Sequence, residues 1–130
     1  MKYTLLAALA ALSLGNAAAQ PSDPCKTQST TLEINACAER TLKAQDGELN
    51  EVYRSLLASL APRDKDDPTA YAEAKKQLVA AQRAWISYRD NDCKAKFSLH
   101  ALGTIRTAVY LGCLAERTEQ RIKELRAWSE

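Results

Sequence analysis

The side chains best suited to chemistry lie in one stretch, QRAWISYRDNDC, which begins at Gln82. On a helical wheel with 100° per residue, Gln82, Arg89 and Asp92 fall within about 60° of Trp85, whereas Asp90 points away. Three polar side chains therefore share a face with an aromatic residue. Such a face could display a ligand pocket, or it could hold a polar network buried within the fold.

A buried arginine needs a partner, because an unpaired charge is costly to remove from water. Asp92 lies three residues beyond Arg89 and could reach it along the helix. Glu39, Asp46 and Asn50 would lie at about the same level on an antiparallel first helix. Buried polar groups are normally satisfied within the fold, so a structural network is favoured over a ligand pocket. We assign to it Gln82, Trp85, Arg89, Asp92, Asp46 and Asn50.

The cysteines offer a choice between disulfides and a metal site. The chain has four, Cys25, Cys37, Cys93 and Cys113, and an even count suggests two disulfides in a short chain that begins with an export signal, as residues 1–19 indicate below. Metal sites use close pairs such as C-x-x-C, whereas here 11, 55 and 19 residues separate successive cysteines. We therefore expect disulfides and no metal.

Enzyme motifs are absent from the sequence. His100 is the single histidine, and there is no G-x-S-x-G nucleophile motif to accompany it. Neither a phosphate-binding loop nor a dinucleotide fingerprint occurs. We expect a non-enzymatic protein without a cofactor.

The first 19 residues have the order of a secretory signal peptide. A positive start at Lys2 is followed by the apolar run TLLAALAALSL and by small residues at 17–19. The run is shorter than the roughly 20 residues that a membrane span needs. We predict a signal peptide at 1–19, no membrane insertion after its cleavage, and a periplasmic or secreted protein.

Charge and length limit the partners and the number of domains. The chain has 18 basic and 16 acidic residues, and loss of Lys2 leaves a nearly neutral mature protein. This balance gives no reason to expect nucleic acid or an anionic membrane as partner. The remaining length fits one domain, residues 20–130.

Apolar residues at helical spacing predict three helices. The first spans about 30–60, with a capping box from Thr30 to Glu33. The second runs from about 68 to 93, with Asp67 as its cap. In the following connection, 94–103, Phe97, Leu99 and Leu102 could pack as a partial turn. The third helix begins with Thr104 as cap and ends near Trp128.

We therefore predict an all-α fold, an elongated antiparallel three-helix bundle stapled by two disulfides. Antiparallel packing places all four cysteines at one end, so each of the three possible pairings is geometrically allowed. We favour Cys93–Cys113 as a staple of the second and third helices, and Cys25–Cys37 as the link that fixes the N-terminal arm.

Several residues also carry a family resemblance. The run from Gln82 to Cys93 follows the pattern Q-x-x-W-x-x-Y-R-D-x-x-C; Leu49-Asn50-x-x-Tyr53 precedes it, and Gly103 and C-x4-T-x2-R-x3-L follow. Over about residues 25–125 the chain resembles the LprI-type lysozyme inhibitor domain family of exported bacterial proteins. The resemblance implies that the protein binds and inhibits lysozyme in the cell envelope.

The contact with a partner is expected on a loop, since an inhibitor must fill or cover the lysozyme cleft. The connections 61–67 and 94–103 are the candidates, with Asp64, Asp66, Asp67 and His100 as possible contact residues. The alternative is a helical binding or structural module for another envelope protein. The sequence does not define the oligomeric state.

Overall fold

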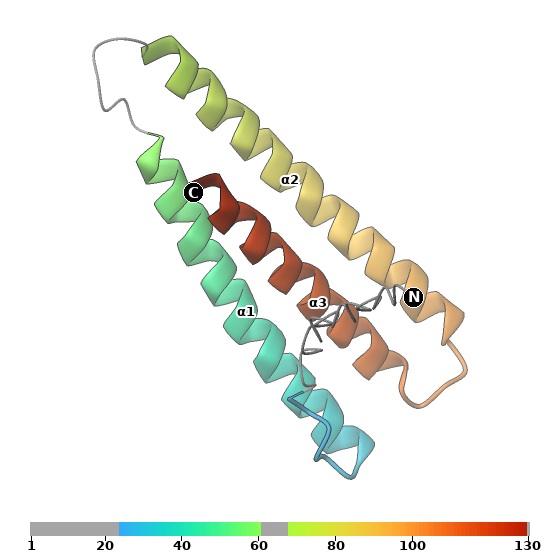
Figure 1. Cartoon of the computed structure of the whole chain (residues 1–130). Coiled ribbons are helices and arrows are strands. Elements are labelled where there is room, and N and C mark those ends of the chain that lie inside the picture. Colours follow the sequence, from blue (N-terminus) through green and yellow to red (C-terminus); the bar gives the residue numbers. More distant parts are fainter. Residues whose placement is uncertain (1–23, 61–67, 130) are drawn as a thin grey trace, which may run out of the picture.

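The computed structural model describes residues 24–60 and 68–129, and within these ranges the chain forms three α-helices. They are α1 (Thr31–Ser59), α2 (Pro68–Leu99) and α3 (Arg106–Arg126), and a short 3-10 helix, η1 (Ala127–Ser129), follows. The helices alternate in direction and form the predicted elongated, antiparallel bundle (Figure 1). At ~1.5 Å per residue, α1 and α2 are both more than about 40 Å long.

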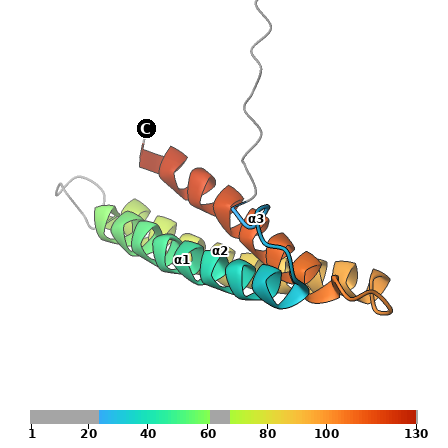
Figure 2. The ribbon, with the colours of Figure 1, turned by 90° about the horizontal axis from the view of Figure 1, so that it is seen from below.

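The helices are not equivalent in the bundle. α1 and α2 form one layer, and α3 lies on one side of that layer (Figure 2). The shorter α3 packs against both long helices along much of its length. The two long helices are therefore held together mainly through α3.

The capping box predicted for α1 is confirmed. The Thr30 hydroxyl accepts a hydrogen bond from the Glu33 backbone N–H at 3.2 Å, and the Glu33 carboxylate accepts from the Thr30 N–H at 3.0 Å. These bonds satisfy two donors that a helix start would leave unpaired. The helix then continues without interruption through Gly47.

The α2–α3 connection differs from the expectation in two ways. α2 continues beyond residue 93 to Leu99, because the residues after Cys93 are good helix formers and Phe97 meets Tyr110 of α3 edge-on at 5.8 Å. Thr104 was wrongly predicted to cap α3. The N-cap residue is Ile105, which makes no side-chain capping bond.

Both favoured disulfides are confirmed. Cys25 is bonded to Cys37 with Cα atoms 5.7 Å apart, and Cys93 is bonded to Cys113 with Cα atoms 5.6 Å apart. The first ties the N-terminal arm to α1, and the second joins α2 to α3. The start of α1 and the connection from α2 to α3 lie at the same end of the bundle (Figure 1), so both disulfides belong to that end.

The core consists of two apolar clusters. Near the Cys93–Cys113 disulfide, Leu114 packs with these cysteines, and Leu42 and Tyr110 border them. The other cluster contains Leu49, Leu56, Leu78, Ile122 and Leu125. Each helix contributes side chains to both clusters, and between the clusters each helix directs at least one polar side chain toward the other helices.

Some predictions fall outside the described residues. They are the signal peptide at 1–19, the domain start at residue 20, and the roles of Asp64, Asp66 and Asp67. Within the described ranges, no helix combines the length and apolar character needed to cross a membrane.

Candidate functional site

A layer of polar side chains lies between the two apolar clusters, at the level of the QRAWISYRDNDC stretch. All three helices contribute to it. We call it the central polar layer; it comprises Asp46 of α1, Gln82 and Arg89 of α2, and Thr118 and Arg121 of α3. Thr118 is fully buried and Gln82 is 6% exposed, so these groups depend on each other rather than on water.

Arg89 is the centre of this layer. Its Nη1 donates to the Asp46 carboxylate at 2.9 Å and to the Thr118 hydroxyl at 3.0 Å. Its Nε donates to Asp90 at 3.0 Å. The side chain is only 13% exposed, as expected for an arginine on the inward face. The predicted pairing of a buried Arg89 with a carboxylate is thus present.

Trp85 is in contact with two guanidinium groups. The Cζ atom of Arg89 is 5.2 Å from the ring centroid, and that of Arg121 is 5.9 Å from it. Arg121 also donates to the Gln82 side-chain oxygen at 3.0 Å. The contacts combine cation–π attraction with hydrogen bonding, and together they connect α2 to α3.

Asp92 pairs differently from the expectation. Its carboxylate accepts from Nε of Arg117 at 3.1 Å and lies 3.0 Å from Nη2 of the same residue. Among the described residues, the carboxylates that pair with Arg89 are Asp46 and Asp90. The hydrogen bond to Asp92 is the main cause that raises the pKa of Arg117 above its ordinary value. Asp92 therefore forms a second, more exposed link between α2 and α3.

Asn50 is exposed, and its backbone carbonyl accepts a hydrogen bond from Nε of Arg54 at 3.2 Å. Sequence reasoning missed Thr118 and Arg117, and it placed Asp90 on the outer face although its carboxylate reaches Arg89. Thr118 interrupts an apolar stripe on α3, which is the same signal that singled out Gln82 and Arg89.

The central polar layer is suited to holding helices rather than to transferring protons. Arginine keeps its proton at all physiological pH values and offers donors only. The oxygens of Gln82 and Thr118 are already engaged by guanidinium groups. The arrangement consequently provides fixed hydrogen bonds and geometry between helices.

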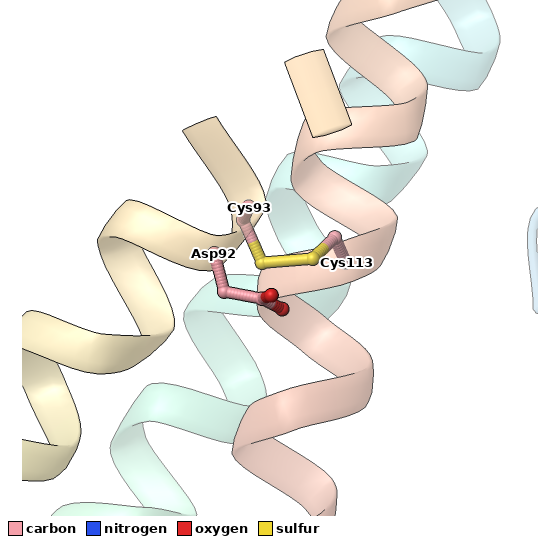
Figure 3. A group of neighbouring side chains, drawn as sticks. All are labelled: Asp92, Cys93 and Cys113. Atoms are coloured by element: carbon pink, nitrogen blue, oxygen red, sulfur yellow. A yellow bond between two sulfur atoms is a disulfide. The ribbon is translucent and has the colours of Figure 1, made fainter. Parts of the chain in front are cut away.

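One group in the described residues has the composition of a metal site. Ligand atoms of Asp92, Cys93 and Cys113 lie within 4.8 Å of one another. Figure 3 shows the carboxylate beside the bond between the two sulfur atoms. Metal ligation requires thiolates, and here the sulfurs are joined in a disulfide while Asp92 is held by Arg117. The group is therefore a structural staple.

The most unusual surface feature is the turn between α2 and α3. Its aliphatic side chains project into solvent: Leu99 is 85% exposed, Leu102 104% and Ile105 53%. The expectation that Leu99 and Leu102 pack in a partial turn was therefore wrong. We call Leu99, Leu102 and Ile105 the apolar tip. His100, a predicted contact residue, is exposed in the same turn.

The backbone of this turn is held by its own hydrogen bonds. The N–H groups of His100 and Gly103 donate to Phe97 and His100 carbonyls at 3.1 and 2.8 Å. Arg106 donates to the Ala101 carbonyl at 2.9 Å, and its guanidinium lies 5.4 Å from the centre of the Phe97 ring. The turn thus rests on the aromatic pair and the disulfide beneath it.

Together, these features define a small, disulfide-stapled, all-α protein with a polar layer in its core and an exposed apolar turn. The chain belongs to the LprI lysozyme inhibitor family, because the family model described as "Lysozyme inhibitor LprI" matches residues 22–125. The match includes the central polar layer, both disulfides and the apolar tip.

A curated relative extends this result. The chain is 39% identical over 117 residues to an uncharacterized protein of Rhizobium meliloti (strain 1021), and the alignment covers 87% of this chain and 84% of that protein. No solved structure matches the chain.

Proposed function

We propose that this protein binds and inhibits lysozyme outside the cytoplasm, in the periplasm or after secretion. The observation that carries the proposal is the family match over residues 22–125. The two disulfides support it, because such bonds persist in oxidising compartments.

Inhibition by this fold would be a binding function, without catalysis by the inhibitor. The side chains of the central polar layer are engaged between helices, so a partner has to be met by the surface. Disulfides and buried polar contacts keep that surface in one conformation, which reduces the entropy lost on binding.

The test is a lysis assay with the exported, purified protein. It should slow the clearing of a peptidoglycan suspension by at least one type of lysozyme. A soluble chito-oligosaccharide substrate provides the necessary control, because inhibition must persist when the protein cannot act by coating peptidoglycan. Absence of inhibition of several lysozyme types at micromolar excess would refute the proposal.

The second candidate is a binding module for a different envelope protein. The nearly neutral composition favours it, since lysozymes with a strongly cationic surface would attract an acidic inhibitor. Affinity capture from an envelope extract without lysozyme, followed by reconstitution with the purified partner, tests this function. Failure to reconstitute any complex would count against it.

A further inference from the structure

The apolar tip is an exposed surface that the fold does not use. Leu99, Leu102 and Ile105 leave most of their apolar area in water, which is unfavourable unless a partner covers it. Their exposure does not mean that this end of the bundle lacks packed side chains. Phe97 and Tyr110, one turn below, are packed against each other.

The tip is held in place by ordered structure. Hydrogen bonds within the turn and the contact of Arg106 with Ala101 set its backbone. The Cys93–Cys113 disulfide joins the two helices at its base. A partner would therefore meet a prearranged tip and would lose little entropy by ordering it.

The segment that carries the tip is also basic. Residues 93–115 include Lys94, Lys96 and Arg106 and contain no aspartate or glutamate. The surface that covers the tip should accordingly combine apolar groups with negative charge.

A lysozyme cleft has this combination. Glycosidases of this kind place two carboxyl groups beside the scissile bond, and in lysozyme one of them lies in an apolar pocket. The cleft must also be open enough to admit a polysaccharide. It offers the concave surface that a projecting helical turn requires.

On these grounds, and resting on the proposed function, we propose that the apolar tip enters the substrate cleft of lysozyme. Leu99 and Leu102 fill apolar subsites, and the basic residues beside them face the carboxyl groups of the cleft. Substrate is then excluded by direct occupation.

The test compares inhibition by two variants. The double variant Leu99→Gln/Leu102→Gln removes the apolar anchors at positions that are already exposed. Leu32→Gln is its matched control, because Leu32 is an 80% exposed leucine at the start of α1. We expect the double variant to weaken inhibition on the order of tenfold to a hundredfold, as for central interface anchors, and the control to act like the unchanged protein. Circular dichroism and intact disulfides confirm folding.

A charge reversal beside the tip, with a matched control, gives an independent measurement. Lys94→Glu should weaken the complex with lysozyme several-fold, mainly through faster dissociation, since it places a carboxylate beside the carboxyl groups of the cleft. Lys75→Glu, at the other end of α2, is the exposed control. Tri-N-acetylchitotriose, which occupies the cleft, should compete with the protein for lysozyme.

The outcomes separate the two proposals. If the unchanged protein inhibits lysozyme and the double tip variant inhibits equally well, the tip assignment is overturned while the proposed function stands. Failure of chitotriose to compete overturns it as well. If the unchanged protein binds anionic phospholipid vesicles, and the double tip variant loses this binding but still inhibits lysozyme, the tip is assigned to a membrane surface instead. If the unchanged protein inhibits no lysozyme, both proposals fall.

Discussion

Arg89 on α2 and Asp46 on α1 form an ion pair in which Nη1 and Oδ1 are 2.9 Å apart. The same nitrogen donates to Thr118 on α3, so one side chain joins the three helices. A shift of any helix by one turn would break these bonds and place the polar groups against apolar clusters. We infer that the central polar layer fixes the register of the bundle, a role documented for buried polar residues in some helical assemblies.

Replacement of Arg89 tests this inference. Arg89→Ala should lower the free energy of unfolding by about 3 kcal/mol, because buried Thr118 loses its donor and Trp85 loses a stacked cation. Asp46 contributes less to this loss, since its side chain is 42% exposed and water can replace the arginine. Urea denaturation followed by circular dichroism measures the change. The exposed Arg83→Ala should be nearly neutral, and equal effects of the two variants would contradict the inference.

The sequence predicted the inward-facing members of the layer on α2 because burial follows the helical period. Gln82 and Arg89 lie one turn from Leu78 and Cys93, so a wheel is enough to place them on the core face. The pairing of Asp92 with Arg117 could not be obtained in this way. It depends on the axial level of α3 relative to α2, which a single-helix wheel does not contain.

The turn between α2 and α3 was the least predictable part of the fold. Leucines are usually buried, so Leu99 and Leu102 were expected to pack. Whether they do depends on where α2 ends and on the direction in which the chain then leaves it. The backbone bonds that set this direction, such as that from Gly103 to His100, have no clear signature in side-chain type.

The core cluster around Leu78 provides a second prediction. Leu78 is fully buried and packs in one cluster with Leu49 of α1 and Ile122 of α3. Leu78→Ala should cost about 2–5 kcal/mol, through lost burial and the cavity that remains. Thermal or urea unfolding measures it. The neighbouring Val79, which is only partly buried, should tolerate alanine at a much smaller cost; the reverse order would show that the core is wrongly placed.

The staple between α2 and α3 provides a third prediction. The double variant Cys93→Ala/Cys113→Ala removes the disulfide between residues that are 20 positions apart in the sequence. In the chain-entropy model this lowers the free energy of unfolding by about 3 kcal/mol. Urea unfolding of the variant and of the unchanged protein gives the difference. Reduction with dithiothreitol should destabilise the unchanged protein further than it does the variant, because the variant retains only Cys25–Cys37. Equal sensitivity to the reductant would contradict the assigned role of the staple.

The capping box at the start of α1 should be sensitive to acid. The bond from the Thr30 hydroxyl, with the backbone bonds from Thr30 and Ser29, lowers the pKa of Glu33 below its ordinary value of 4.5. A carboxyl group whose pKa is lower in the folded state stabilises that state fully above the unfolded pKa, and the contribution is lost as the pH falls through the folded pKa. Protection of the Thr30 and Glu33 amides from hydrogen exchange, corrected for intrinsic rates, should therefore decrease as the pH is lowered below about 4.5. In Glu33→Gln this dependence should vanish, because glutamine does not titrate. The same acid sensitivity in both proteins would show that another group controls the start of α1.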